Sequence, residues 1–512
     1  MAETNETPVA VAQPEKKKRK MLNSFTMLFL ITAIIAVLTW IIPAGQYQLD
    51  DAGNYIAGTY ERVAQSPQGI WDLFMAPIRG FLGTETTPGA VEVALFIMVI
   101  GGFLGVVTET GAIDAGISAM MKNNKDNMTT LIWGLMFIFV LGGSTYGMNE
   151  ETMAFYPLLI PLMVAVGMDA LVAIAVILLG SGIGCLASTV NPFATVIASD
   201  MANISIADGI AIRTIMAIVL WALSAWYVSS YAKKVQEDPK NSLIYDMMPE
   251  HKERFKVKEM DTITGKQKGV LWIFGLTFLI MILSLIPWSD LFPGFTLFES
   301  IQNTFLDMPF IGNLLGQSQR GLFFGMWYLV EITMLFFMSS VIIGFFYGID
   351  ESRFVEVFLD GVKDLLSVAM ICAVARGIQV VMNDGQITAT VLSWGEAGLK
   401  GLNEGLFTIL TYLFYIPMSF LIPSTSGLAA ATMGIMAPLG DFANVGKDVV
   451  VTAYQTACGI VNIITPTSGV VMGALAIAGI ELTTWWKFMK KIGIIIVVVS
   501  LVLLLASTYL GI

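Results

Sequence analysis

Two adjacent glutamates, Glu150 and Glu151, lie between strongly apolar stretches in the segment "GGSTYGMNEETMAF", residues 142–155. Burying an ionised carboxylate among apolar groups is costly unless a cation or hydrogen-bond donors compensate it. Carboxylates also form strong, sometimes bidentate, hydrogen bonds with guanidinium groups. We therefore expect at least one of the two glutamates to bind a cationic group. The alternative is that both lie at an aqueous mouth or pair with structural cations.

The composition is that of a membrane protein. Of the 512 residues, 56% are hydrophobic and 13% are charged, and the mean hydropathy is +0.74. Soluble proteins carry about 25% charged residues. Nucleic acid is not expected as a partner, because the chain has no basic domain and no base-stacking motif. The lipid bilayer is the expected surrounding.

No cofactor, metal or enzymatic chemistry is expected. The three cysteines, Cys185, Cys372 and Cys458, lie in apolar stretches without metal-ligand spacing and are predicted to be packing residues. The single histidine, His251, lies in a charged loop. Glycine runs such as "GGFLG" and "GSGIG" lack the lysine and the strand context of a nucleotide-binding loop. No catalytic triad, zinc motif or pair of catalytic acids is evident.

The predicted fold is an all-α polytopic membrane protein in two halves. Residues 1–21 end in a basic cluster and are predicted to be a disordered cytoplasmic N-terminus. The first membrane half is 22–231, and a cytoplasmic linker with nine Lys or Arg residues follows at 232–269. The second membrane half is 270–512. The apolar runs are at 21–42, 91–109, 129–143, 150–166, 170–187, 193–203 and 210–231, and then at 270–286, 321–347, 361–383, 405–422, 428–440, 449–464, 467–480 and 487–510.

Several of these runs are too short to cross a bilayer, and they recur in the two halves. "STYGMNEETM" (144–153) aligns with "STSGLAAATM" (424–433), and "VVTETGAI" (106–113) aligns with "VVMNDGQI" (380–387). Polar, proline-bearing breaks interrupt 170–203 at "STVNP" and 449–480 at "TPTSG". Matching interrupted segments in two halves indicate a duplication that surrounds a transport site. We predict two re-entrant hairpins, at 129–166 and 405–440, and two broken helices.

The positive charges predict that the two halves are inverted. Counting each broken pair as one crossing leaves nine crossings, with the N-terminus inside and the C-terminus outside. This arrangement places the 232–269 linker and Lys487, Lys490 and Lys491 on the cytoplasmic side, as the positive-inside rule prefers. The first hairpin then opens from the cytoplasm and the second from outside.

These motifs resemble those of a known family. "GGSTYGMNEETMAFYPLLIPLM", "GCLASTVNPFATVIAS", "IPMSFLIPSTSGLAAATMGIMAPLGDF" and "TPTSGVVMGALA" are similar to segments of the YfcC/DcuC-type carriers, within the ion-transporter superfamily. The resemblance extends from about residue 22 to 510 and is strongest to the ArcD-type arginine/ornithine antiporters. It implies a multi-pass secondary carrier in a bacterial plasma membrane. Relatives of this broad architecture often dimerise, so the resemblance allows a homodimer.

Hairpin tips and helix breaks expose free N–H groups at half-helix N-termini, where the helix dipole favours anions. These four loops are therefore candidates to bind a substrate carboxylate. The alternative for each side chain is close packing between membrane helices. Together with Glu150 and Glu151, the candidate substrate-binding residues in these loops are Ser144, Thr145, Gly147, Asn149, Asn191, Ser424, Thr425, Ser426, Gly427, Thr465, Thr467 and Ser468.

Arg376 lies deep within an apolar run, in "MICAVARGIQVV". Such an arginine needs a carboxylate, and we expect either a structural pair with Glu331 or Asp364 or a bond to the substrate's carboxylate. Asn383 and Asp384 are expected to line the route to the site or to form a solvated helix end. Aromatic rings that could stack on a guanidinium are Tyr146, Phe155, Tyr156, Trp394 and Tyr454.

The hairpins differ in charge, which leads to a hypothesis about the cargo. Asn149, Glu150 and Glu151 in the first hairpin correspond to three alanines, 429–431, in the second. A cationic substrate explains carboxylates on one side only. With the resemblance, this predicts electroneutral exchange of arginine for ornithine. The alternative is a sodium- or proton-coupled symporter for C4-dicarboxylates or small peptides, with ions held at the two breaks.

Overall fold

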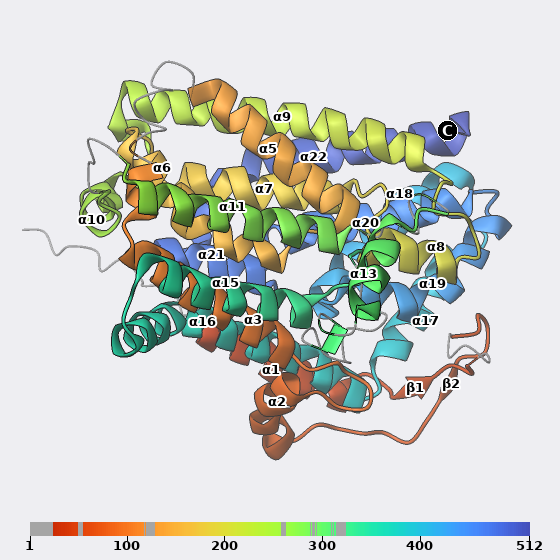
Figure 1. Ribbon diagram of the computed structural model, residues 1–512. Helices are drawn as coiled ribbons and strands as arrows, with labels where there is room; N and C mark the ends of the chain where they lie inside the picture. The colour runs from red at the N-terminus through yellow and green to blue at the C-terminus, as the bar shows by residue number, and fades with distance from the viewer. Residues whose placement is uncertain are drawn as a thin grey trace, which may run out of the picture.

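The computed structural model describes residues 24–49, 55–116, 118, 128–257, 263–286, 288, 292, 294–308, 310, 312–313 and 324–511. The predicted N-terminal segment 1–21 lies outside these residues. Figure 1 shows an elongated bundle of helices with a small antiparallel pair of strands at one end. The strands are β1 (Gly45–Gln46) and β2 (Glu61–Arg62).

The larger helices of the first half are α1 (Ser24–Ile41), α2 (Ile70–Leu82), α3 (Val91–Glu109), α5 (Met128–Tyr146), α6 (Tyr156–Ala165), α7 (Ala170–Leu186), α8 (Ile197–Met201) and α9 (Ile210–Glu237). The helices that follow are α10 (Met248–Arg254), α11 (Gly265–Leu285), α13 (Leu297–Asp307), α15 (Leu329–Tyr347), α16 (Glu351–Asp384), α17 (Thr388–Leu399), α18 (Glu404–Leu421), α19 (Thr425–Phe442), α20 (Lys447–Asn462), α21 (Gly469–Ala478) and α22 (Leu482–Leu510). Short helical turns are η1 (Glu150–Phe155), η2 (Pro192–Val196), η3 (Pro239–Asn241) and η4 (Tyr245–Met247).

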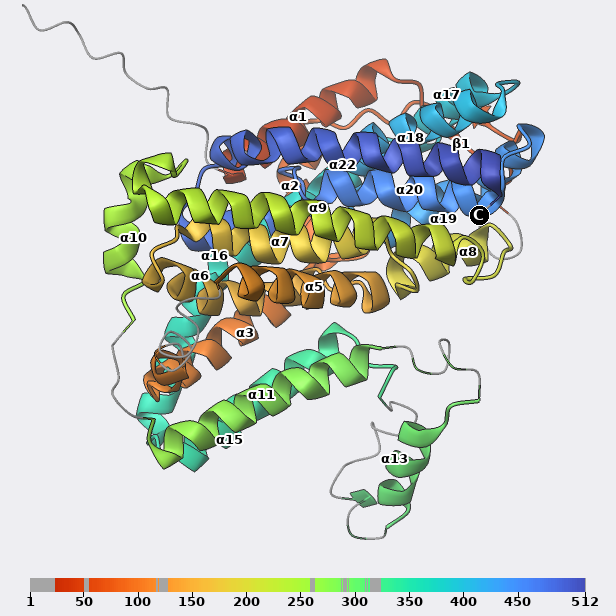
Figure 2. The same ribbon diagram turned by 90° about the horizontal axis from the view of Figure 1, so that it is seen from above.

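Two pairs of helices form the predicted re-entrant hairpins. In the first, α5 ends at Tyr146, the chain turns at Gly147, and η1 and α6 return. Gly147 has a φ of +78°, in the left-handed region that favours glycine. In the second, α18 ends at Leu421 and α19 begins after Ser424, whose side chain caps it by accepting from Gly427 N at 3.2 Å. Figure 2 shows α6 returning toward the end of the molecule that holds α10, while α18 and α19 lie toward the opposite end.

Two helices are broken, as predicted. Helix α7 stops at Leu186 and continues after a gap as η2 and α8, and α20 stops at Asn462 and continues as α21. Alone, α7 and α21 are shorter than the helices that span a bilayer by length and composition. Each broken helix therefore crosses only as a pair of pieces.

The packing of the helices repeats between the halves. Helix α5 packs on α7 and α9, and α18 packs on α20 and α22 in the same way. Helix α1 packs on α16, while α15 packs on α3. At the centre of the molecule, α3 packs on α16 and α7 packs on α20. This exchange of equivalent contacts confirms the inverted-repeat architecture.

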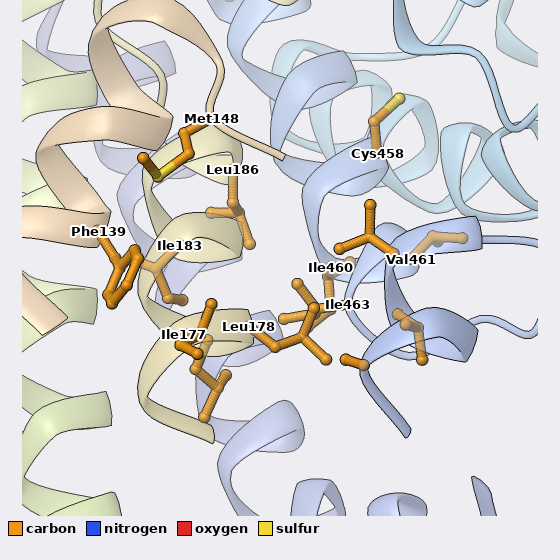
Figure 3. Close-up of a cluster of buried hydrophobic side chains, with 14 of the residues drawn as sticks. Phe139, Met148, Ile177, Leu178, Ile183, Leu186, Cys458, Ile460, Val461 and Ile463 are labelled. Carbon is orange, nitrogen blue, oxygen red and sulfur yellow. The ribbon is translucent and has the colours of Figure 1, made fainter. Parts of the chain in front are cut away.

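The central contact between the broken helices is apolar and reciprocal (Figure 3). Leu178 and Leu186 of α7 lie toward Ile460 and Ile463 of the second half, whereas Ile183 lies beside Phe139 of α5, and all six side chains are buried. Glycines allow this approach. A Cβ added to Gly182 would lie 2.0 Å from Ile463, and one added to Gly459 would lie 2.4 Å from Leu186.

The glycine runs of the sequence mark where helix backbones touch. A Cβ added to Gly101 of α3 would lie 2.3 Å from the Gly361 carbonyl oxygen of α16. One added to Gly143 of α5 would lie 2.2 Å from the Ser181 carbonyl oxygen of α7. Small residues let membrane helices approach closely in this way. "GGFLG" and "GSGIG" are therefore packing motifs.

Ion pairs hold the two ends of α16, one to α3 and the other to α2. Arg353, near the start of α16, contacts both carboxylate oxygens of Glu109 at the end of α3, each at 2.8 Å. At the other end Arg79 of α2 pairs with Asp384. Asn383 donates to Thr87 Oγ1 at 2.9 Å. Asn383 and Asp384 do not line the cavity described below, and both side chains form structural contacts. Their place on the route to the site stays a prediction.

The segment between the halves docks on the ends of membrane helices. Asp169, which caps α7, accepts hydrogen bonds from Ser242 Oγ and Tyr231 OH, each at 2.6 Å. The His251 ring of α10 is 2% exposed, bonds the backbone of Ala478 at the end of α21 and meets the edge of Phe255. Its Nδ1 has no hydrogen-bond partner among the described residues. The segment therefore contacts both halves.

We expect Gly143→Ala to destabilise the protein, because the added methyl group meets backbone atoms of α7 that cannot move away. Overpacking typically costs about 1–3 kcal/mol. The midpoint of thermal aggregation in detergent measures the effect. Gly134→Ala on the same helix is the matched control, since nothing lies within 4 Å of its added Cβ. Equal midpoints for the two variants would contradict the close contact.

The docking of α10 should weaken in acid. Burial, followed by the charge of Arg254, lowers the pKa of His251, while Glu250 and Asp169 oppose this effect. The docked state thus favours neutral histidine. The docking of α10 is complete at a pH above about 6.5, the ordinary pKa of histidine. It is lost as the pH falls from there through the lower pKa of the docked His251 ring. The protection of 248–254 against hydrogen–deuterium exchange, corrected for the pH dependence of intrinsic exchange, should fall on acidification in the wild type and much less in His251→Gln. The same pH dependence of protection in both proteins would refute the assignment.

Candidate functional site

A cavity of about 450 Å³ lies where both hairpin tips and both helix breaks meet α3, α15 and α16. Small-molecule sites in proteins usually measure about 300–1,000 Å³. The structure brings most of the predicted site residues to its wall: Gly147, Asn149, Glu150, Glu151, Asn191, Arg376, Ser424, Thr425, Ser426, Thr467 and Ser468. Their role in binding substrate stays a prediction.

Four predicted residues, Ser144, Thr145, Gly427 and Thr465, do not line the cavity. Ser144 joins the first hairpin to the first break, since its carbonyl oxygen accepts from Thr189 N at 3.0 Å. The Thr145 hydroxyl donates to Leu141 O at 2.7 Å within α5. Gly427 N donates to Ser424 Oγ at 3.2 Å, and the Thr465 hydroxyl meets Thr467 Oγ1 at 2.9 Å. The hydrogen bonds of these four residues thus belong to the local structure around the cavity and not to its wall.

The two glutamates are placed by the start of η1. Asn149 N donates to Glu151 Oε2 at 3.0 Å, which fixes that carboxylate beside its own turn. Glu151 is 4% exposed, while Glu150 is half-buried. Both line the cavity. Neither therefore lies in bulk water, and the cavity wall carries negative charge on this side.

Arg376 brings positive charge to the same cavity from α16. Among the described residues it forms no ion pair, although it interacts electrostatically with Glu150. Glu331 instead caps α15 by accepting from Tyr328 N at 3.0 Å, and Asp364 is exposed. The expected structural pair with Glu331 or Asp364 is therefore wrong. The guanidinium is left facing the cavity.

Two helix N-termini end at the cavity wall. Helix α19 begins behind Ser424, and α21 begins behind Ser468, whose side chain accepts from Val471 N at 3.4 Å. Thr425, Ser426, Gly469 and Val470, in the first turns, line the cavity. First-turn N–H groups have no partner within the helix, and the helix dipole favours negative charge there. This part of the wall suits a carboxylate.

The breaks themselves are satisfied by side chains. Asn191 Oδ1 accepts from Phe193 N at 2.8 Å, and Gln455 of α20 donates to Ser188 O at 3.0 Å. Trp485 and Trp486 of α22 donate to the carbonyls of Ile463 and Ile464, each at 2.8 Å. The first break is thus held partly by the second half.

Several lining residues escaped the sequence analysis. None of the five proposed aromatic residues lines the cavity, but Phe193 and Tyr328 do. Phe193 directly follows the predicted break, which was a usable signal. Glu92 and Tyr328 lie within the predicted apolar runs 91–109 and 321–347, outside the repeated motifs, so no signal marked them. The cysteines were predicted to pack, yet Cys185, Cys372 and Cys458 all line the cavity.

Inverted halves, paired hairpins and a charged central cavity define a membrane transporter. The chain belongs to the family of C4-dicarboxylate anaerobic carriers (DcuC), which its residues 21–509 match. An uncharacterized protein of Haemophilus influenzae is 30% identical, over 95% of this chain and 97% of that protein. The "Putative basic amino acid antiporter YfcC" of Escherichia coli K12 is 25% identical, over 98% and 99%.

Two solved transporter structures are also similar to this chain. The YdaH transporter of Alcanivorax borkumensis gives a TM-score of 0.45 at 14% identity, covering 96% of this chain and 99% of its own. MtrF of Neisseria gonorrhoeae, from a class of antimetabolite efflux pumps, gives a TM-score of 0.43 at 15% identity, covering 96% of each chain.

The cavity can be tested through its cysteines without knowing its ligand. In variants that retain one cysteine each, a small methanethiosulfonate reagent should modify Cys185 and Cys372 faster than Cys458. The reason is that the first two side chains are half-buried whereas Cys458 is 1% exposed. Mass spectrometry of the intact protein measures the rates. Lys400→Cys, at an exposed helix end, is the accessible reference. If Cys458 reacted fastest, the cavity wall would be placed wrongly.

Proposed function

We propose that this transporter exchanges basic amino acids, arginine for ornithine, by alternating access. The observation that supports it best is the opposite charge on two walls of one cavity: Glu150 and Glu151 on η1, and Arg376 on α16 without a structural ion pair among the described residues. A basic amino acid carries the complement. Its α-carboxylate suits Arg376 and the helix N-termini, and its cationic groups suit the glutamates.

The two cargoes have the same charge and similar length, so one set of contacts can serve each in turn. The glutamates also explain obligatory exchange. An empty carrier has to move uncompensated carboxylates through a dry barrier, which is costly, whereas a bound cation neutralises part of this charge. The second hairpin has alanines at 429–431, and these residues do not line the cavity. The negative charge therefore comes from one hairpin tip.

The comparisons favour different cargoes. The name of the Escherichia coli relative refers to basic amino acid antiport, whereas the family name refers to C4-dicarboxylates. Arg376 and the helix N-termini also suit a dicarboxylate carried by sodium- or proton-coupled symport. Three acids, Glu92, Glu150 and Glu151, outnumber the one lining arginine, however, and would repel a dianion. We therefore favour the basic amino acid.

We propose an orientation as well. The start of α1 and helix α10 face the cytoplasm of a bacterium, and α22 ends outside its plasma membrane. Figure 1 is consistent with a crossing of this kind, since α10 and the C-terminus lie at opposite ends of the bundle. A basic linker on the cytoplasmic side agrees with the positive-inside rule.

Proteoliposomes test the exchange. Uptake of labelled arginine should require internal ornithine or arginine and should be indifferent to an imposed sodium gradient. Uptake of labelled succinate that depends on a sodium or proton gradient, without exchange of arginine, would establish the alternative instead. Empty liposomes and liposomes with unrelated protein are the controls.

Substitutions that each remove one charge test the two walls separately. Glu150→Gln and Glu151→Gln should lower the affinity for arginine, at least one of them by about tenfold or more, because a hydrogen bond to a charged group is worth about 1.5–3 kcal/mol. Arg376→Gln should reduce the preference for arginine over agmatine, which lacks the α-carboxylate. Competition against labelled arginine measures both effects. If neither glutamate variant changed the affinity, the cationic assignment would lose its physical basis.

A further inference from the structure

Two aromatic side chains, Phe193 and Tyr328, line the cavity and are its only aromatic residues in the described part of the chain. Their ring centroids are 4.9 Å apart, and the ring planes meet at 40°. Phe193 belongs to the first break and Tyr328 precedes α15, so the contact joins two distant parts of the sequence. The proposed exchange assigns no role to the rings of Phe193 and Tyr328.

The backbone holds each ring in position. Phe193 N donates to Asn191 Oδ1 at 2.8 Å, and Tyr328 N donates to Glu331 Oε2 at 3.0 Å. Each residue is thus fixed at the start of a helical segment. Phe193 is half-buried and Tyr328 is 40% exposed, so ring surface remains available to a ligand in the cavity.

The ring of Tyr328 lies among the charged groups of the site. Its phenol interacts electrostatically with Glu150, Glu151, Arg376 and Glu92, which are the charged residues that line the cavity. The carboxylates and both rings line the same cavity, so a cationic ligand in it can meet a carboxylate and an aromatic face together. Rings attract cations within about 6 Å of the centroid.

The two cargoes differ in how they use such a ring. A guanidinium is planar, weakly hydrated and able to bond a carboxylate through its edge while its faces stack on aromatic rings. An ammonium group is a compact, strongly hydrated point charge without such a face. Aromatic rings beside a carboxylate thus discriminate between guanidinium and ammonium compounds.

We propose that Phe193 and Tyr328 form a guanidinium-binding aromatic pair, which makes this site prefer arginine to ornithine. The inference rests on the proposed function, because it assigns the cationic end of the exchanged amino acid to these rings. Glu150 and Glu151 supply the charge, and the ring pair supplies the selectivity. The acids alone attract either cargo.

Phe193→Leu and Tyr328→Leu test the proposal in the proteoliposome assay. Each should raise the KM for arginine by about threefold, the order expected of an exposed cation–π contact. The concentration of ornithine that half-inhibits arginine uptake, corrected for the new KM, should stay near its wild-type value. Tyr328→Phe keeps the aromatic face and should keep the wild-type preference.

Trp394→Leu is the matched control, since Trp394 is exposed on α17 and does not line the cavity. Equal changes in the affinity for both amino acids, or none, would overturn the aromatic assignment while leaving the exchange in place. Failure of the wild type to exchange arginine would remove the proposed function and this inference together. If one leucine variant does not fold, as judged by its thermal midpoint, the other decides.

Discussion

Backbone amide and carbonyl groups that leave a helix at membrane depth need hydrogen-bond partners, because lipid offers none. This requirement brings the interrupted segments to the centre of the protein. The first break is closed by Asn191 and by Gln455 from the other half, and the carbonyls after α20 accept from Trp485 and Trp486. The first hairpin tip bonds Thr189 in the first break. The cavity is the space left where these partners meet.

The scaffold is symmetric in its contacts, but the charges in it are not. Equivalent helices make equivalent contacts in both halves, down to the glycines that let Ile463 and Leu186 cross the central interface. The carboxylates of η1 have no counterpart in α19, and Arg376 comes from α16 alone. The duplicated helices thus supply two equivalent sets of hairpins and breaks. The charges in the cavity come only from side chains on particular segments, and they are not repeated in the other half.

The hairpins and breaks were predictable because they carry their own local signals. Gly147 and Pro192 interrupt apolar runs that are otherwise continuous, and the repeat places a second example of each motif in the other half. Glu150 could be located because it follows such a turn. That Arg376 faces the cavity and does not pair with Glu331 or Asp364 could not be predicted, since a position along a helix does not say which neighbour its side chain meets. Tyr328 and Glu92 enter the cavity through the packing of α15 and α3, which no local pattern encodes.

The contact between α3 and α16 limits how this protein can rearrange. Gly101 and Gly361 bring the two backbones so close that rotation of either helix about its own axis would drive the side chains beside these glycines into the neighbouring main chain. The ion pair of Arg353 with Glu109 resists a lengthwise shift of α3 along α16, and the pair of Arg79 with Asp384 ties α2 to the other end of α16. Helices α3 and α16 are therefore expected to move as one rigid unit. Any change of shape is therefore expected where other helices pack on this pair, and not between α3 and α16.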